Sequence, residues 1–98
     1  MVYLGATKTL RVTWRDIDET LLTPDTQEWI IKDSKGVTKE TLAEDDLSIV
    51  SEGVYRYDYL VPEDGETGPW KLIAKAKKLS DPVDRWGVQV KQFEVTAP

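Results

Sequence analysis

Alternation of apolar and polar residues is the feature that most constrains how this chain can fold. Tyrosines occupy every second position from residue 55 to residue 59, and between residues 70 and 77 apolar residues alternate mainly with lysines. A period of two puts one set of side chains on a core and the other in water, as in a β-strand. We therefore expect an all-β chain with little helix. Further β-like runs lie at 9–14, 27–32, 37–42 and 85–95.

Turn signals between these runs predict which strands pair. The sequence Asp-Ser-Lys-Gly at 33–36 favours a hairpin between the strands at 27–32 and 37–42. Residues 63–69 are expected to form a second hairpin loop, which joins the tyrosine-rich strand to the lysine-bearing strand. The acidic stretch at 43–46 is expected to be a loop or a single helical turn.

The last strand is expected to run from about Arg85 to Val95. By alternation its apolar residues share one face up to residue 90 and fall on the other face from residue 93. An extra residue near Lys91 and Gln92 would return them to one face, so we predict a β-bulge there. The residues concerned are Trp86, Val88, Val90, Phe93 and Val95.

Short strands separated by turn signals are typical of a two-layer fold. About seven of them predict an antiparallel β-sandwich of immunoglobulin-like type. A length of 98 residues is that of one domain, so we expect a single sandwich over residues 1–98.

Aromatic residues are expected to supply much of the core of this sandwich. The tyrosines Tyr55, Tyr57 and Tyr59 share one face and are predicted to pack inward. The tryptophans all fall on apolar faces and are predicted to be core, although a groove for carbohydrate or peptide is the alternative. They are Trp14, Trp29, Trp70 and Trp86.

Composition excludes several classes of function. With 13 Lys and Arg against 18 Asp and Glu, the net charge is −5, so we do not expect nucleic acid as a partner. Cysteine and histidine are absent, which removes thiolate nucleophiles, imidazole bases and the common zinc ligands. We expect no catalytic residue, no cofactor and no metal. No apolar run approaches the roughly 20 residues of a membrane helix, and the start does not read as a signal peptide.

Two charged clusters are candidate sites. The turn with Asp16, Asp18 and Glu19 could hold a calcium ion, but it lacks the glycine and the bidentate glutamate of an EF-hand loop, and a solvated turn is the simpler interpretation. A row of lysines on the solvent side of a strand could steer an acidic partner, or could serve only to prevent edge-to-edge aggregation. These lysines, the candidate interaction surface, are Lys71, Lys75, Lys77 and Lys78.

A resemblance appears at the order Gly-x-Tyr, strand, Pro, loop, Gly-x-Trp, strand, which runs from Gly53 through Pro62 to Gly68 and Trp70. It resembles the small stand-alone immunoglobulin-like proteins among the structural proteins of tailed bacteriophages. The resemblance implies a role in virion structure, namely capsid decoration, the head–tail connection or a tail accessory, and it implies no catalytic residues. It also covers residues 10–16, 23–26 and 32–36.

The sequence thus leads to one main hypothesis and one alternative. The main hypothesis is a non-catalytic virion protein, made in the host cytoplasm, that docks on its own copies or on a capsid, connector or tail protein through an open sheet edge and turn loops. The alternative is a small immunoglobulin-like module that binds carbohydrate or peptide against exposed tryptophans. A hydrolase based on paired carboxylates is a third reading, but nothing in the sequence marks a cleft for it.

Overall fold

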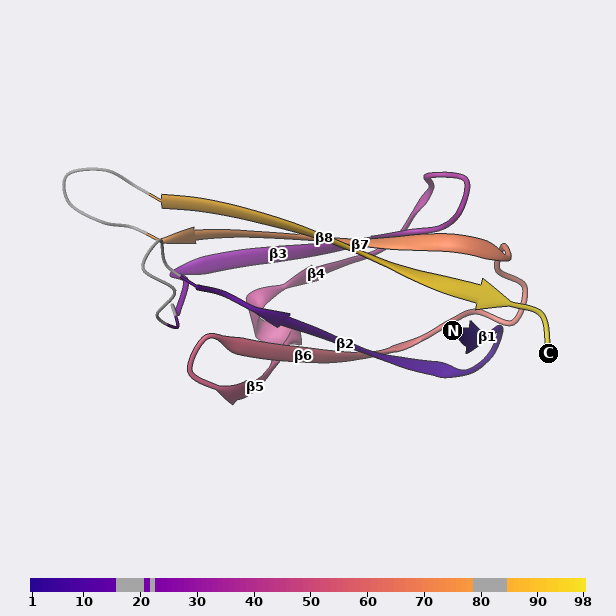
Figure 1. Ribbon diagram of the computed structural model, residues 1–98, viewed down its shortest axis with the longest axis horizontal. Coiled ribbons are helices and arrows are strands. Elements are labelled where there is room, and N and C mark those ends of the chain that lie inside the picture. The colour runs from indigo at the N-terminus through magenta and orange to yellow at the C-terminus, as the bar shows by residue number, and fades with distance from the viewer. Residues whose placement is uncertain (16–20, 22, 79–84) are drawn as a thin grey trace.

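The computed structural model describes residues 1–15, 21, 23–78 and 85–98, without the side chains of residues 78, 85 and 86. This part of the chain is nearly all strand, with one turn of 3-10 helix (Figure 1). The elements are β1 (Val2–Tyr3), β2 (Thr7–Thr13), β3 (Thr26–Lys32), β4 (Thr38–Ala43), η1 (Glu44–Asp46), β5 (Ser48–Ser51), β6 (Val54–Leu60), β7 (Gly68–Lys78) and β8 (Arg85–Thr96).

The strands form two sheets that lie face to face (Figure 1). The five-stranded sheet has the order β1-β8-β7-β3-β4, and the three-stranded sheet has the order β2-β6-β5. Neighbouring strands are antiparallel except β1 and β8, which run parallel where Val2 lies opposite Val95. The expected all-β sandwich is confirmed. Its body is elongated, with extents of 49 × 24 × 23 Å.

The core lies between the two sheets and is built from the inward half of each alternating strand. Trp70 of β7 is fully buried, and its ring centroid lies 6.2 Å from those of Tyr59 on β6 and Phe93 on β8. Such tilted ring pairs add to the burial of large apolar surfaces. Other fully buried side chains are Val12, Trp29, Ile31, Val61, Leu72 and Ala74.

The hairpin predicted across residues 63–69 is wrong. β6 belongs to the three-stranded sheet, whereas β7 lies in the five-stranded sheet between β3 and β8. Both β6 and β7 have a long apolar face. These faces bury more surface when the strands lie in opposite sheets and pack against each other than when the strands are neighbours in one sheet. The loop therefore crosses between the layers. The hairpin at 33–36 is confirmed by the pairing of β3 with β4, and the acidic stretch does contain a helical turn, η1.

The β-bulge predicted near Lys91 and Gln92 is also wrong. β8 pairs with β7 in one unbroken register over residues 85–95. Alternation therefore continues through the whole strand, and Val88 and Val90 face outward while the second half of the strand turns its apolar residues to the core.

The reason lies in what fills the inner face of the first half of β8. A Cβ atom on Gly87 would lie 3.0 Å from Cζ3 of Trp14, so the indole already occupies this space. Two residues along, Nε2 of Gln89 donates a hydrogen bond of 2.7 Å to the carbonyl oxygen of Thr13 on β2. At this end of the sandwich Trp14, which follows β2, fills the core beside β8. Val88 and Val90 can therefore face outward without leaving a cavity.

Candidate functional site

Several apolar side chains lie on the outer face of the five-stranded sheet, which is turned away from the core. The register of β3, β7 and β8 aligns Ile30, Ile73 and Val90 across the sheet, and we call these three residues the apolar row. Val90 is 59% exposed, and its neighbour Val88 is 62% exposed. Contiguous exposed apolar patches are typical of surfaces that contact other molecules, so this face is a candidate contact surface.

Lysines of β7 border the apolar row, and they lie on the solvent side of their strand as the sequence predicted. Lys71 and Lys75 are exposed and Lys77 is partly exposed, because all three alternate with buried residues of the same strand. Lys75 lies opposite Val88 on β8. The side chain of the fourth predicted residue, Lys78, lies outside the described part of the structure. The outer face thus combines basic and apolar side chains, in a chain whose net charge is negative.

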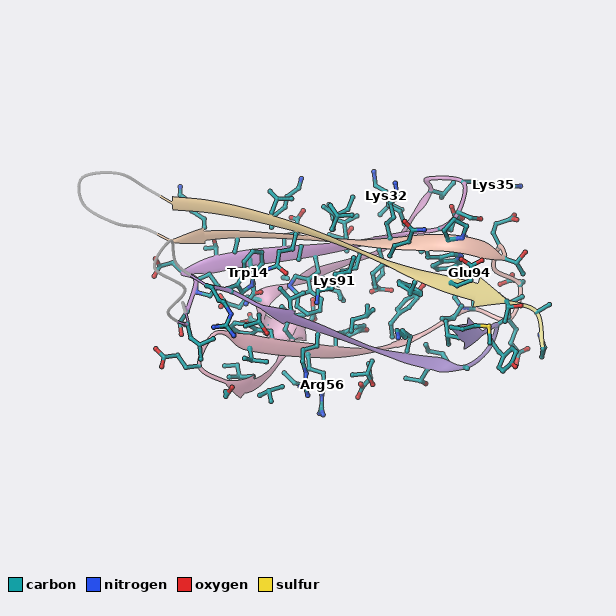
Figure 2. All side chains as sticks on the ribbon, in the orientation of Figure 1. Trp14, Lys32, Lys35, Arg56, Lys91 and Glu94 are labelled. Atoms are coloured by element: carbon teal, nitrogen blue, oxygen red, sulfur yellow. The ribbon has the colours of Figure 1, made fainter. Side chains whose placement is uncertain are left out.

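A further lysine on this face, Lys32, was missed from the sequence. It lies directly opposite Lys71 in the antiparallel register of β3 and β7, and Figure 2 shows its side chain on the outer side of the sheet. Residues directly opposite each other point to the same side, with Cβ atoms about 5 Å apart. The two strands are far apart in sequence, so no local pattern could predict this pair.

A hollow of about 500 Å³ opens at the two opposed lysines. One wall is the turn between β3 and β4, and the floor includes the apolar side chains of Pro69 and Ile73 on β7. The hollow therefore offers two ammonium groups beside an apolar floor. Its full lining is Lys32, Asp33, Ser34, Lys35, Gly36, Pro69, Lys71 and Ile73.

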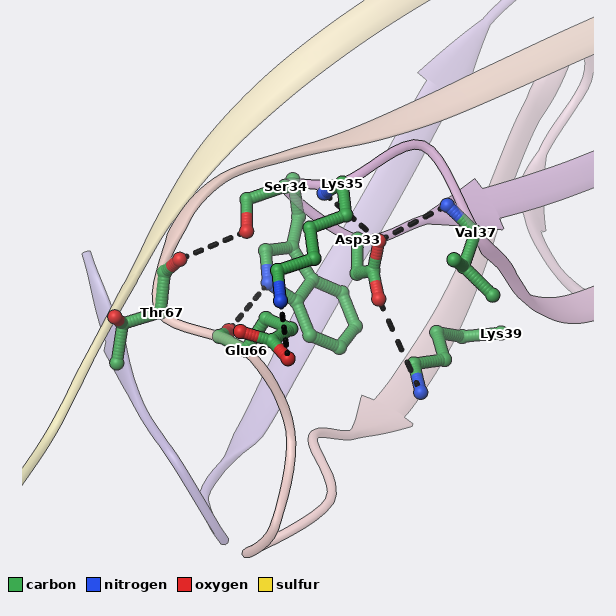
Figure 3. A network of polar contacts seen from close by, with 8 residues as sticks. Asp33, Ser34, Lys35, Val37, Lys39, Glu66 and Thr67 are labelled. Atoms are coloured by element: carbon green, nitrogen blue, oxygen red, sulfur yellow. Dashed lines mark hydrogen bonds and ion pairs between the residues drawn. The ribbon is translucent and has the colours of Figure 1, made fainter.

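The turn that forms this wall is held rigidly (Figure 3). The Asp33 side chain is buried, and its Oδ1 accepts hydrogen bonds from the backbone N–H groups of Lys35 and Val37 at 2.9 and 3.0 Å. Oγ of Ser34 donates a hydrogen bond of 2.8 Å to the carbonyl oxygen of Thr67, in the loop before β7. The wall is thus fastened to the strand that carries the floor of the hollow.

The acidic side chains that the structure describes do not gather into a metal site. The turn with Asp16, Asp18 and Glu19 lies outside the described residues. In the loop before β7, Oε1 of Glu66 is 3.3 Å from Nζ of Lys35, so this carboxylate is engaged by a lysine. Within residues 1–15, 21, 23–78 and 85–98, no group of three or more acidic side chains converges as metal ligands would.

The tryptophans that the structure describes are core residues, as predicted. Trp14 is 4% exposed, and both Trp29 and Trp70 are 0% exposed. The side chain of Trp86 lies outside the description. A carbohydrate or peptide groove built on stacked indoles would need rings open to solvent, and these three rings are enclosed.

A buried glutamine that the sequence analysis overlooked links two of these rings. Gln27 is 7% exposed, and its Oε1 accepts hydrogen bonds of 3.1 Å from Nε1 of Trp14 and from Nε1 of Trp29. Its Nε2 has no hydrogen-bond partner among the described residues. Alternation with Trp29 and Ile31 was the signal that could have placed Gln27 on the inner face. Its contacts tie together the two sheets rather than form a reactive centre.

Tyrosines near this cluster have pKa values shifted for structural reasons. Burial, and then the negative charge of Glu44, raise the pKa of the Tyr55 hydroxyl, while the polar amide of the nearby Gln27 lowers it in part. Burial, followed by Glu40, likewise raises the pKa of Tyr59. A phenol whose pKa lies above its ordinary value of about 10 stays protonated at neutral pH, so neither group is activated as a base.

Comparison with family models, curated proteins and solved structures finds no match to this chain. No helix in the described part is long and apolar enough to cross a bilayer. Function is therefore inferred from the chain's own residues and the surface they form.

Proposed function

We propose that this chain is a non-catalytic, immunoglobulin-like protein-contact module that serves as a structural or assembly protein of a tailed-bacteriophage particle. Its roles there would be capsid decoration, the head–tail connection or a tail accessory. The virion setting is supported by the resemblance carried by the Gly-x-Tyr and Gly-x-Trp strands. The contact role is supported by the outer face of the five-stranded sheet, where Val88 and Val90 are exposed beside a row of lysines.

Energetics favour a contact role for this face. Burying one exposed valine side chain contributes roughly 1.5 kcal/mol, and the fold itself gains little of this from Val88 or Val90. A partner that covered both would gain it, together with the area of the apolar row. The bordering lysines would speed the approach of an acidic partner and disfavour a basic one.

The virion role is tested by measuring copy number. Particles of the source phage would be purified through two density gradients, and this chain would be quantified by mass spectrometry against the major capsid protein. We expect a fixed number of copies per particle that is the same in both gradients. Absence of the chain from infectious particles would overturn the virion assignment.

The contact face is tested by replacing its valines. A Val88→Glu, Val90→Glu variant should fold normally, because both positions are exposed, yet should fail to enter particles in a complementation experiment. The matched control is an Ile49→Glu, Leu60→Glu variant, which places the same charges at residues of the three-stranded sheet that are 73% and 64% exposed. Equal incorporation of both variants would show that the outer face of the five-stranded sheet is not the contact surface.

A further inference from the structure

The opposed lysines, Lys32 and Lys71, are an arrangement that the isolated fold does not favour. Like charges directly opposite each other in an antiparallel pair destabilise a sheet. No ion pair joins either side chain to a carboxylate within the described residues. What distinguishes the two lysines from other charged strand residues is that both line the same hollow.

Two carboxylates at the hollow and its rim are already engaged. Oδ1 of Asp33 accepts two backbone hydrogen bonds, and its Oδ2 lies 3.9 Å from Nζ of Lys39. The Glu66 carboxylate pairs with Lys35 on the rim of the hollow. Neither Lys32 nor Lys71 forms an ion pair with a described residue, so both ammonium groups are available to an anionic ligand.

The hollow is also shaped and fixed before any ligand arrives. Its wall is the turn held by Asp33 and Ser34, and its floor carries Ile73, which belongs to the apolar row. Figure 3 shows the turn fastened to the loop before β7. A ligand that places an anion between the lysines can thus extend an apolar side chain along the row toward Val90. Because the site is preformed, little ordering of the protein opposes binding.

We propose that this hollow binds carboxylate side chains on an extended acidic segment of a partner protein, with an apolar residue of that segment on Ile73. The inference rests on the proposed contact function and names the chemistry of the partner. Carboxylates between two ammonium groups relieve the repulsion between the lysines, and the apolar floor suits a polypeptide. A short segment brings only a few negative charges to a chain of net charge −5, whereas a nucleic acid would bring a long polyanion.

Defined peptides test the site directly. Acetyl-Glu-Thr-Glu-Thr-Val amide, in which both Glu residues and the Val share one side of an extended chain, would be titrated into ¹⁵N-labelled protein, with the Gln and Lys versions of the same peptide as probes of charge. We expect the Glu peptide to bind with a Kd of about 1 mM or tighter, at least about fivefold tighter than the Gln peptide, and the Lys peptide not to bind. The amides that shift should be those of Lys32, Lys71, Ile73 and the 34–36 turn. Raising NaCl from about 0.05 to about 0.5 M should weaken binding severalfold, because the screening length falls from roughly 14 to roughly 4 Å.

Matched variants separate this site from general charge effects. Lys71→Glu should reduce affinity for the Glu peptide at least about tenfold, and Lys71→Gln should give an intermediate loss. Arg56→Glu is the control, since Arg56 is exposed on the opposite face and also lies opposite a like charge, Arg11 (Figure 2). It changes net charge by the same amount and should leave affinity within about twofold.

Four results would overturn the inference. They are no binding of the Glu peptide, equal loss in Lys71→Glu and Arg56→Glu, tighter binding of a short oligothymidylate than of the Glu peptide, and self-association that Lys71→Glu abolishes. The last two would assign the site to nucleic acid or to a second copy. None of them depends on particle copy number, so the virion proposal would stand or fall separately.

Discussion

Gln27 offers the sharpest test of how the two sheets are held together. Its Oε1 accepts hydrogen bonds from two buried indoles, those of Trp14 and Trp29, each at 3.1 Å. The amide orientation is fixed by these donors, because a flipped amide would turn its own N–H groups toward them. Gln27→Leu removes the acceptor and leaves both indole N–H groups buried without a partner.

The magnitude follows from counting the groups left unsatisfied. Each buried donor without an acceptor costs about 1–3 kcal/mol. Taking about 1.5 kcal/mol for each indole N–H, the two together cost about 3 kcal/mol. The substitution also removes Nε2 of Gln27, which has no partner among the described residues, and this offsets about 1 kcal/mol. We expect a net loss of about 2 kcal/mol in the free energy of unfolding.

Urea unfolding followed by circular dichroism measures this loss. With a slope of about 1–2 kcal/mol per molar urea, the midpoint should fall by about 1–2 M and the slope should not change. In a Trp29→Phe background one donor is already gone, so Gln27→Leu should cost about 1 kcal/mol less than in the parent chain. The proposal that Gln27 accepts hydrogen bonds from both indoles would be refuted by either of two results. One is a loss of unfolding free energy below about 0.5 kcal/mol for Gln27→Leu in the parent chain, and the other is an equal loss in the parent chain and in the Trp29→Phe background.

Three further predictions use the same unfolding measurement. Gly68→Ala should lower stability by about 2 kcal/mol, since residue 68 has φ of +114° and a Cβ there would lie 3.1 Å from a carbon of Ser34. Gly36→Ala, with φ of +82° but open space, should cost only about 1 kcal/mol. The raised pKa of Tyr55 means that unfolding exposes a more acidic phenol, so stability should hold below pH of about 10 and fall above it, with a shallower fall in Tyr55→Phe. Lys71→Glu should raise stability by about 0.5 kcal/mol by replacing a like-charge pair with an opposite-charge pair, and about 1 M NaCl should remove the gain.

Local alternation was enough to find the main strands and their inner faces. β3 and β6 were predicted within one residue of their bounds, and Trp29, Tyr55 and Trp70 were correctly placed in the core. This succeeds because the period of two depends only on the neighbouring residues of one strand. Gln27 was overlooked because polarity, and not position, was used to judge burial.

Pairing between distant strands could not be predicted in the same way. The β6–β7 loop was expected to close a hairpin, yet β7 pairs with β3, roughly forty residues earlier in the chain. Lys32 and Lys71 lie opposite each other only because β3 pairs with β7, so the hollow between them could not be predicted from the sequence. The bulge expected in β8 failed for a related reason, since Trp14 from the other sheet fills the place assigned to the valines of β8.

The structure bears on whether the proposed contact surface is an edge or a face of the sandwich. Sequence reasoning favoured an open edge, and among the described strands β8 is paired on one side only with β1, at its end. However, Lys91 lies opposite the buried Leu72, so it stands on the inner face of this edge strand and is exposed. An inward-facing lysine on an edge strand disfavours the addition of another strand, because the added strand would have to cover its charge. A partner on the outer face would cover the apolar row and could pair its carboxylates with the bordering lysines, which favours the face as the proposed contact surface.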